Sequence, residues 1–111
     1  MNVRWSEQAL AEFADAAAYV AREFGRQTAL KMRAGINEAI LNIIQFPQIG
    51  KVCFSDEEMS IDFRELVVRL NSVIYVIHEE EIYIVSIWSN RRDRSKLYAI
   101  LKNDVKQNNK Q

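Results

Sequence analysis

The chain is poor in cysteine, proline and glycine, with one, one and three of each in 111 residues, and its fifteen basic residues only equal its fifteen acidic ones. Because Cys53 stands alone, no internal disulfide can form and no cysteine-based metal site can be assembled. A zero net charge means that the summed field does not by itself attract nucleic acid. The sequence also shows no metal-ligand cluster and no nucleotide-binding loop, so we expect no cofactor.

Long apolar runs are missing as well. No run approaches the roughly 20 residues that a membrane-spanning helix needs, and residues 1–5 lack the charged-then-apolar layout of a secretion signal. We therefore expect a cytoplasmic protein without a membrane segment. The length suits one domain over residues 1–111, large enough to bury a core without disulfides or metals.

Two stripes of apolar residues at helical spacing occupy the first half of the chain. Ser6 is predicted to cap the first helix, because its hydroxyl can accept from the free amides of the first turn. The stripe over residues 9–24 ends at Gly25, and a second stripe covers residues 29–43. Pro47 and Gly50 close the second helix. The two stripes predict a helical hairpin with one shared apolar face.

The second half is rich in Val, Ile and Tyr and predicts strands, which we place at residues 61–68, 73–78 and 82–88, after a short first strand at 2–5. Residues 51–60 show no clear period and are interpreted as a loop or a ragged connection. A last helix is predicted to end in a ragged tail from about residue 106. The order strand, helix, helix, three strands, helix predicts an α+β fold, in which a small antiparallel sheet packs against the hairpin and leaves its other face for a site.

The most informative stretch is residues 91–98, RRDRSKLY, which places four cations and a tyrosine at the end of a strand. These cations could bind a negatively charged ligand. Together with the hairpin, the exit at residues 47–50 and the segments FRELVV and VIYVI, this stretch resembles the RelE/ParE superfamily of toxins over about residues 2 to 101. The hairpin is similar to the ParE branch, and the final segment is nearer to the RelE branch.

The two branches imply different functions. RelE-like toxins cut mRNA in the ribosomal A site without a metal, and the resemblance assigns the matching catalytic positions to Arg64, Arg92 and Tyr98. Leu66 and Ser72 stand where the RelE pattern has two further cations. Loss of one preorganised donor commonly costs about 10²- to 10³-fold in rate. ParE-like toxins are understood to inhibit DNA gyrase by binding, and the two lost cations favour this reading.

Three further arginines are candidates for contacting a target, namely Arg69, Arg91 and Arg94, and Arg69 or Arg94 could substitute for the lost cations. The residues also allow simpler roles: Arg64 as a salt-bridged surface residue and Tyr98 as a packing residue. Three functions therefore stay open, which are a ParE-like gyrase inhibitor, preferred here, a ribosome-dependent mRNA endonuclease, and an inactive protein that only binds an antitoxin.

The resemblance also implies a cognate antitoxin as partner, in a toxin–antitoxin hetero-oligomer, with gyrase or the ribosome and its mRNA as target. An antitoxin would use exposed apolar surface of the hairpin and sheet. The small residues Ala14, Ala17, Ala18 and Ala21 give the first helix a smooth face that suits such a partner or packing within the hairpin equally well.

Overall fold

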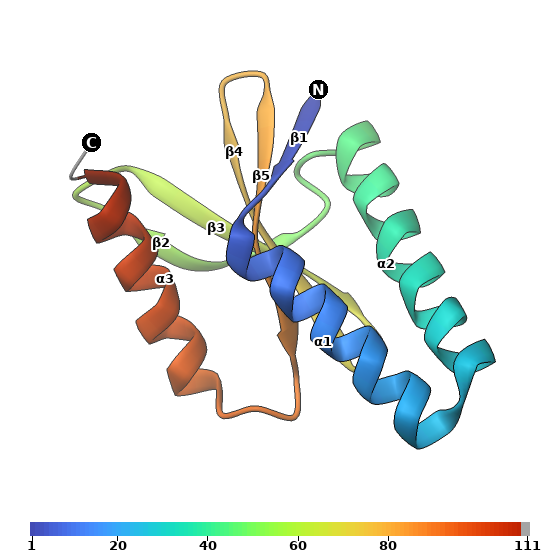
Figure 1. Ribbon diagram of the computed structural model, residues 1–111. Helices are drawn as coiled ribbons and strands as arrows, with labels where there is room; N and C mark the ends of the chain where they lie inside the picture. Colours follow the sequence, from blue (N-terminus) through green and yellow to red (C-terminus); the bar gives the residue numbers. More distant parts are fainter. Residues whose placement is uncertain (110–111) are drawn as a thin grey trace.

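The structure, a computed structural model, describes residues 1–109 and the side chains of residues 1–104. Five strands and three helices follow one another along the chain (Figure 1): β1 (Asn2–Trp5), α1 (Glu7–Phe24), α2 (Arg26–Gln45), β2 (Lys51–Asp56), β3 (Ile61–Val68), β4 (Asn71–His78), β5 (Glu81–Ser89) and α3 (Arg94–Asn109). The predicted α+β class is confirmed, with one strand more than expected. No helix among the described residues is long and apolar enough to cross a membrane.

The strands form one sheet in the order β1-β5-β4-β3-β2. The predicted antiparallel meander is confirmed for β3, β4 and β5. The edge strand β1 is the exception, since it runs parallel to β5, with Val3 beside Ile82. Parallel pairing needs a long crossover connection, and here the whole hairpin and three strands separate the two partners.

The expectation of a loop over residues 51–60 is wrong for its first half, which forms β2. This strand pairs with β3, and the register shifts between Val52 and Phe54, so that Cys53 lies in a bulge. A bulge interrupts the alternation of inward and outward side chains, which explains why no period of two is visible there. Burial raises the pKa of the Cys53 thiol, and this makes the thiol a poorer nucleophile.

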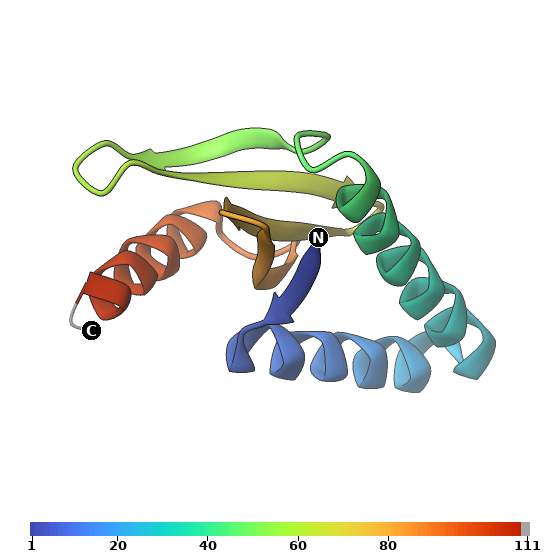
Figure 2. The same cartoon turned by 90° about the horizontal axis from the view of Figure 1, so that it is seen from above.

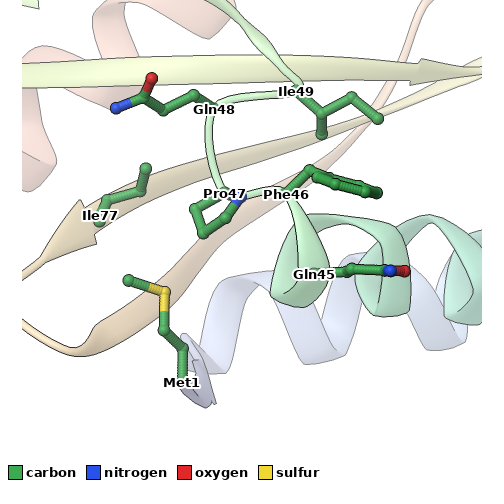
Figure 3. Close-up of a pocket in the computed structure, with 7 residues that line it drawn as sticks. All are labelled: Met1, Gln45, Phe46, Pro47, Gln48, Ile49 and Ile77. Carbon is green, nitrogen blue, oxygen red and sulfur yellow. The ribbon is translucent and has the colours of Figure 1, made fainter.

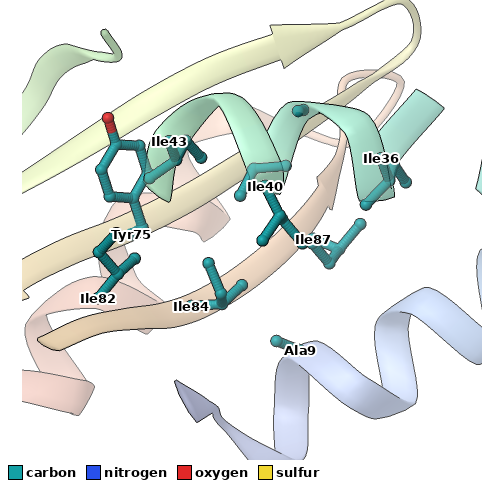
Figure 4. Close-up of a cluster of buried hydrophobic side chains, with 10 residues drawn as sticks. Ala9, Ile36, Ile40, Ile43, Tyr75, Ile82, Ile84 and Ile87 are labelled. Atoms are coloured by element: carbon teal, nitrogen blue, oxygen red, sulfur yellow. The ribbon is translucent and has the colours of Figure 1, made fainter. Parts of the chain in front are cut away.

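The helical hairpin covers one face of the sheet, as predicted. Ser6 caps α1, because its Oγ accepts from the Ala9 N–H at 2.9 Å, and the same Oγ donates to the Val85 carbonyl of β5 at 2.8 Å. Gly25 turns the chain into α2 with a φ of 92°, a left-handed value that glycine adopts readily. Figure 4 shows the resulting core, in which isoleucines of α2 and β5 pack together, with Tyr75 at one end of the cluster.

The opposite face of the sheet is not left open, because α3 packs on it away from the hairpin (Figure 2). Leu97 and Leu101 of α3 are fully buried against Trp88, Phe63 and Ile74. The helix continues to Asn109, beyond the point where a ragged tail was expected, and the end of that predicted tail, 110–111, lies outside the described residues. A site on this face would therefore have to lie at the margins of α3.

Candidate functional site

The cationic stretch 91–98 is divided between a turn and the first turns of α3. The backbone N–H of Arg92 donates to the Ser89 carbonyl at 3.0 Å as the chain leaves β5. Asp93 then caps α3, since its Oδ1 accepts from the Ser95 N–H at 3.0 Å, and this bond holds the pKa of the Asp93 carboxyl below its ordinary value. Neighbouring side chains of the stretch consequently meet different partners.

Arg91 turns toward α1. Its Nη1 donates to the Tyr19 hydroxyl at 2.7 Å, and its guanidinium carbon lies 4.3 Å from the centre of the Tyr19 ring. Arg22 approaches the same ring at 5.8 Å. Such contacts at exposed sites contribute about 0.5–1 kcal/mol each. Arg91 thus helps to hold the turn against α1 and stays exposed.

Arg92 lies over Trp88 and beside Glu12. Its guanidinium carbon is 4.2 Å from the centre of the Trp88 ring, and its Nη1 is 3.5 Å from Glu12 Oε2. Glu12 also accepts from the Ser86 hydroxyl at 2.8 Å and the Ile87 N–H at 3.2 Å, close to where the β4–β5 register shifts. Burial raises the pKa of Glu12, although these contacts oppose it. Arg92 therefore joins the end of the sheet to α1.

Arg94 is held by Glu65 on the α3 face. Its guanidinium donates to both carboxylate oxygens of Glu65, and Ser72 donates a third hydrogen bond to Glu65 at 2.6 Å. Burial raises the pKa of Glu65, but the bonds from Arg94 and Ser72 outweigh burial, so this pKa lies below its ordinary value. The hydrogen bonds to Glu65 also raise the pKa of Arg94. The positive charge of Arg94 is thus balanced inside the protein.

Tyr98 and Arg64 lie on opposite faces of the sheet. The Tyr98 ring packs on the α3 side, with its centre 6.0 Å from that of Phe54. Arg64 points to the hairpin side, where its Nη1 donates to the carbonyls of Gly50 at 2.8 Å and Gln48 at 3.3 Å. Arg64 therefore fastens the connection between α2 and β2.

Tyr75 fastens the same connection from inside the core. Its hydroxyl donates to the Pro47 carbonyl at 2.7 Å and accepts from the Gly50 N–H at 2.9 Å. The side chain is fully buried, and burial raises the pKa of the phenol. Two side chains from neighbouring strands, Tyr75 and Arg64, thus fix residues 47–50.

Two hollows open beside this fixed connection. The first, of about 660 Å³, is lined mainly by apolar side chains (Figure 3), which include Met1, Phe46, Pro47, Ile49 and Ile77. The second, of about 470 Å³, shares Gln48 and Ile77 with the first and adds the charged or polar side chains of Asp62, Arg64 and His78. An apolar hollow therefore adjoins a polar one on this side of the molecule.

The sequence model of the ParE toxin of the type II toxin–antitoxin system parDE matches residues 3–94. The chain belongs to the ParE toxin family. Its fold also matches a solved chain described as the chromosomal ParDE TA system from P. aeruginosa, with a TM-score of 0.67 and 21% identity over 80% of this chain and 95% of that chain. No curated protein matches the sequence. The predicted membership of the RelE/ParE superfamily is thereby confirmed.

On this ParE-family fold the residues expected for RNA cleavage are dispersed. Arg94 and Tyr98 do come together, with the guanidinium carbon 6.0 Å from the ring centre. Arg92 lies at the sheet end, Arg64 on the hairpin face, and Arg69 in the exposed turn between β3 and β4. Glu65 and Arg64, which are adjacent in β3, point to opposite faces of the sheet.

The two positions that lack cations are structural. Leu66 packs against the hairpin core, and Ser72 is fully buried in the bond to Glu65. Sequence reasoning missed the roles of Glu12 and Tyr75. Glu12 lies off the apolar stripe of α1 and resembles a solvated residue, and a tyrosine in a strand gives no sign of its hydroxyl partners.

Arg94→Met is expected to destabilise the protein by about 2 kcal/mol at pH 7. Removing one partner of a buried ion pair costs about 3–5 kcal/mol. The expected cost is smaller here because the Arg94 side chain is 41% exposed and solvent screens its charge. The pKa of Glu65 in the folded protein lies below the ordinary glutamate value of 4.5, so the pair stabilises the fold fully at pH values above 4.5. This stabilisation is lost as the pH falls through the folded-state pKa of Glu65. The difference from wild type should shrink in urea unfolding below pH 4.5.

The matched control is the double variant Glu65→Met with Arg94→Met, which leaves no unpaired charge. It should recover most of the stability and show no such pH dependence. An Arg94→Met penalty that is the same at pH 7 and at about pH 3 would show that the Glu65 charge is not its cause.

Proposed function

We propose that this chain is the toxin of a type II toxin–antitoxin pair and that it arrests growth by binding DNA gyrase, without chemistry of its own. A cognate antitoxin holds it inactive in a hetero-oligomer in the cytoplasm. Family membership supports the toxin role. The gyrase target follows from the resemblance to ParE-like toxins.

The separation of Arg64 from Tyr98 is the observation that carries this choice. RNA cleavage by a 2′-hydroxyl needs a proton acceptor and cations around one phosphorus. Here Arg64 is bound to backbone carbonyls on one face, and Tyr98 packs on the other. Arg94, the nearest substitute cation, is balanced by Glu65. A binding role needs no such convergence.

The mRNA endonuclease remains the second candidate because of the sheet end itself. Arg91 is exposed there, and the Arg92 side chain is 46% exposed. Both arginines follow β5 and give this end of the sheet a cationic surface that an RNA backbone could approach. An inactive, antitoxin-binding protein is the third candidate.

Inducible expression without the antitoxin tests these candidates. Wild type is compared with Tyr98→Phe, which keeps the packing ring and removes the hydroxyl that acid–base catalysis requires. We expect both proteins to arrest growth equally, within about twofold, with DNA damage signalling and intact mRNA, whereas loss of an acid–base group typically costs about 10²- to 10⁴-fold. Growth, mapped mRNA ends and supercoiling by purified gyrase are the readouts.

The other outcomes separate the remaining functions. Ribosome-dependent transcript cuts that disappear with Tyr98→Phe and with Arg92→Ala would establish the nuclease and overturn the gyrase proposal. Absence of any arrest by soluble, folded wild-type protein would leave only the antitoxin-binding role.

A further inference from the structure

The apolar hollow beside residues 46–49 has a wall that the fold holds in place. Phe46 ends α2, and its N–H donates to the Asn42 carbonyl at 2.8 Å, while the Ile49 N–H donates to the Phe46 carbonyl at 2.9 Å. Beneath them, Tyr75 and Arg64 bind the carbonyls and amide of residues 47–50. These hydrogen bonds hold the backbone of the wall, while the side chains of Phe46 and Ile49 stay exposed.

These outward side chains are large. Phe46 is 59% exposed and Ile49 is 45% exposed, and both line the hollow together with Pro47 and with Ile77 of β4 (Figure 3). Clustered apolar groups around a preformed hollow mark interaction sites more often than scattered ones do. The hollow is wide open to solvent, so a bulky side chain of a partner would lie against its apolar wall rather than inside an enclosed cavity.

The adjoining polar hollow supplies a charge. Arg64 forms no ion pair with a carboxylate in the described part of the chain, because its bonds go to two neutral carbonyls. Asp62 lines the same hollow and keeps its negative charge while it accepts from the Ser55 hydroxyl at 2.6 Å, and His78 lies 3.9 Å from Glu79. A carboxylate of a partner could therefore form an ion pair with the Arg64 guanidinium next to the apolar hollow.

We propose that the two hollows form one docking site for a segment of the antitoxin in which a bulky apolar side chain lies next to an aspartate or glutamate. The apolar side chain lies on the hollow lined by Phe46, Ile49 and Ile77, and the carboxylate pairs with Arg64. The proposal rests on the proposed function, since it needs an antitoxin. Rigid walls lower the ordering cost of binding, which makes the site an anchor for the rest of the antitoxin.

The test uses the full chain and its cognate antitoxin. Ile49→Asp and Phe46→Ser alter exposed side chains of the apolar hollow. The matched control is Leu70→Asp, an equally polar change at a residue that is 66% exposed in the β3–β4 turn, at the other end of these strands. We expect both hollow variants to bind the antitoxin about 30- to 100-fold more weakly by calorimetry, and the control to change within about twofold.

Overlapping peptides covering the antitoxin then identify the segment. The peptide that binds wild type should contain the apolar and acidic pair, and alanine at either position should weaken its binding. The proposal assigns the hollow to the antitoxin and not to the target, so all variants should still arrest growth without antitoxin.

Four outcomes would overturn the proposal. In the first, the hollow variants bind the antitoxin as tightly as wild type does, and in the second, the antitoxin peptide that binds lacks the acidic and apolar pair. In the third, the hollow variants lose growth arrest but still bind the antitoxin, and in the fourth, they change only in self-association. The last two would assign the hollow to the target or to a second copy. If wild type itself fails to bind the antitoxin, the proposed pairing fails, which is distinct from loss in the hollow variants alone.

Discussion

Gly50→Ala is expected to destabilise the fold by about 4 kcal/mol. A Cβ at this position would lie 2.7 Å from Tyr75 Oη, 2.8 Å from Tyr75 Cε1 and 3.0 Å from the Glu65 carbonyl oxygen. Tyr75 is fully buried and Glu65 O belongs to the backbone of β3, so neither can yield cheaply. Overpacking costs about 1–3 kcal/mol, and displacing Tyr75 breaks hydrogen bonds that contribute roughly 1 kcal/mol each.

Gly35→Ala is the matched control, because its added Cβ would meet only Val68 Cγ1, at an ordinary 3.6 Å. In the interior of α2 this change should stabilise the protein by about 1 kcal/mol. Urea unfolding of both variants measures the contrast. A Gly50→Ala protein within about 1 kcal/mol of wild type would mean that residues 47–50 can move away, and the hollow would then not be preformed.

Helices and strands that have a clear local pattern of apolar residues or a capping residue are predicted well from the sequence. The stripes over residues 9–24 and 29–43 became α1 and α2, and Ser6 caps α1 as expected. The β3–β4 and β4–β5 turns were harder, because each places a non-glycine residue at a left-handed φ, 58° at Arg69 and 55° at Glu79. Such conformations cost about 1–3 kcal/mol and are imposed by the pairing of the strands, which local sequence does not contain.

The site was predicted as a stretch of sequence, but the fold distributes it. Residues 91–93 belong to the turn after β5 and Arg94 begins α3, so the backbone changes direction within the stretch. Arg91 therefore reaches Tyr19, Arg92 reaches Trp88, and Arg94 reaches Glu65. These partners come from distant parts of the chain, and adjacency in the sequence gave no information about them.

Trp88→Ala is expected to cost about 3–5 kcal/mol, the largest core penalty on the α3 face. Trp88 is fully buried among Phe63, Leu97 and Leu101. Its loss would leave a cavity under α3 and remove the ring beneath Arg92, which lies 4.2 Å away. Urea unfolding should show the loss of stability, with an unchanged dependence on urea concentration if the native state stays compact.

Trp88→Phe isolates the ring from the indole nitrogen. Trp88 Nε1 is buried and has no hydrogen-bond partner in the part of the chain that the structure describes. Removing the indole nitrogen therefore breaks no hydrogen bond. The free energy of unfolding should fall by about 1–2 kcal/mol, because phenylalanine has the smaller volume. A penalty for Trp88→Phe as large as that for Trp88→Ala would mean that the indole N–H has a partner in solution, such as a buried water, that holds β5 and α3 together.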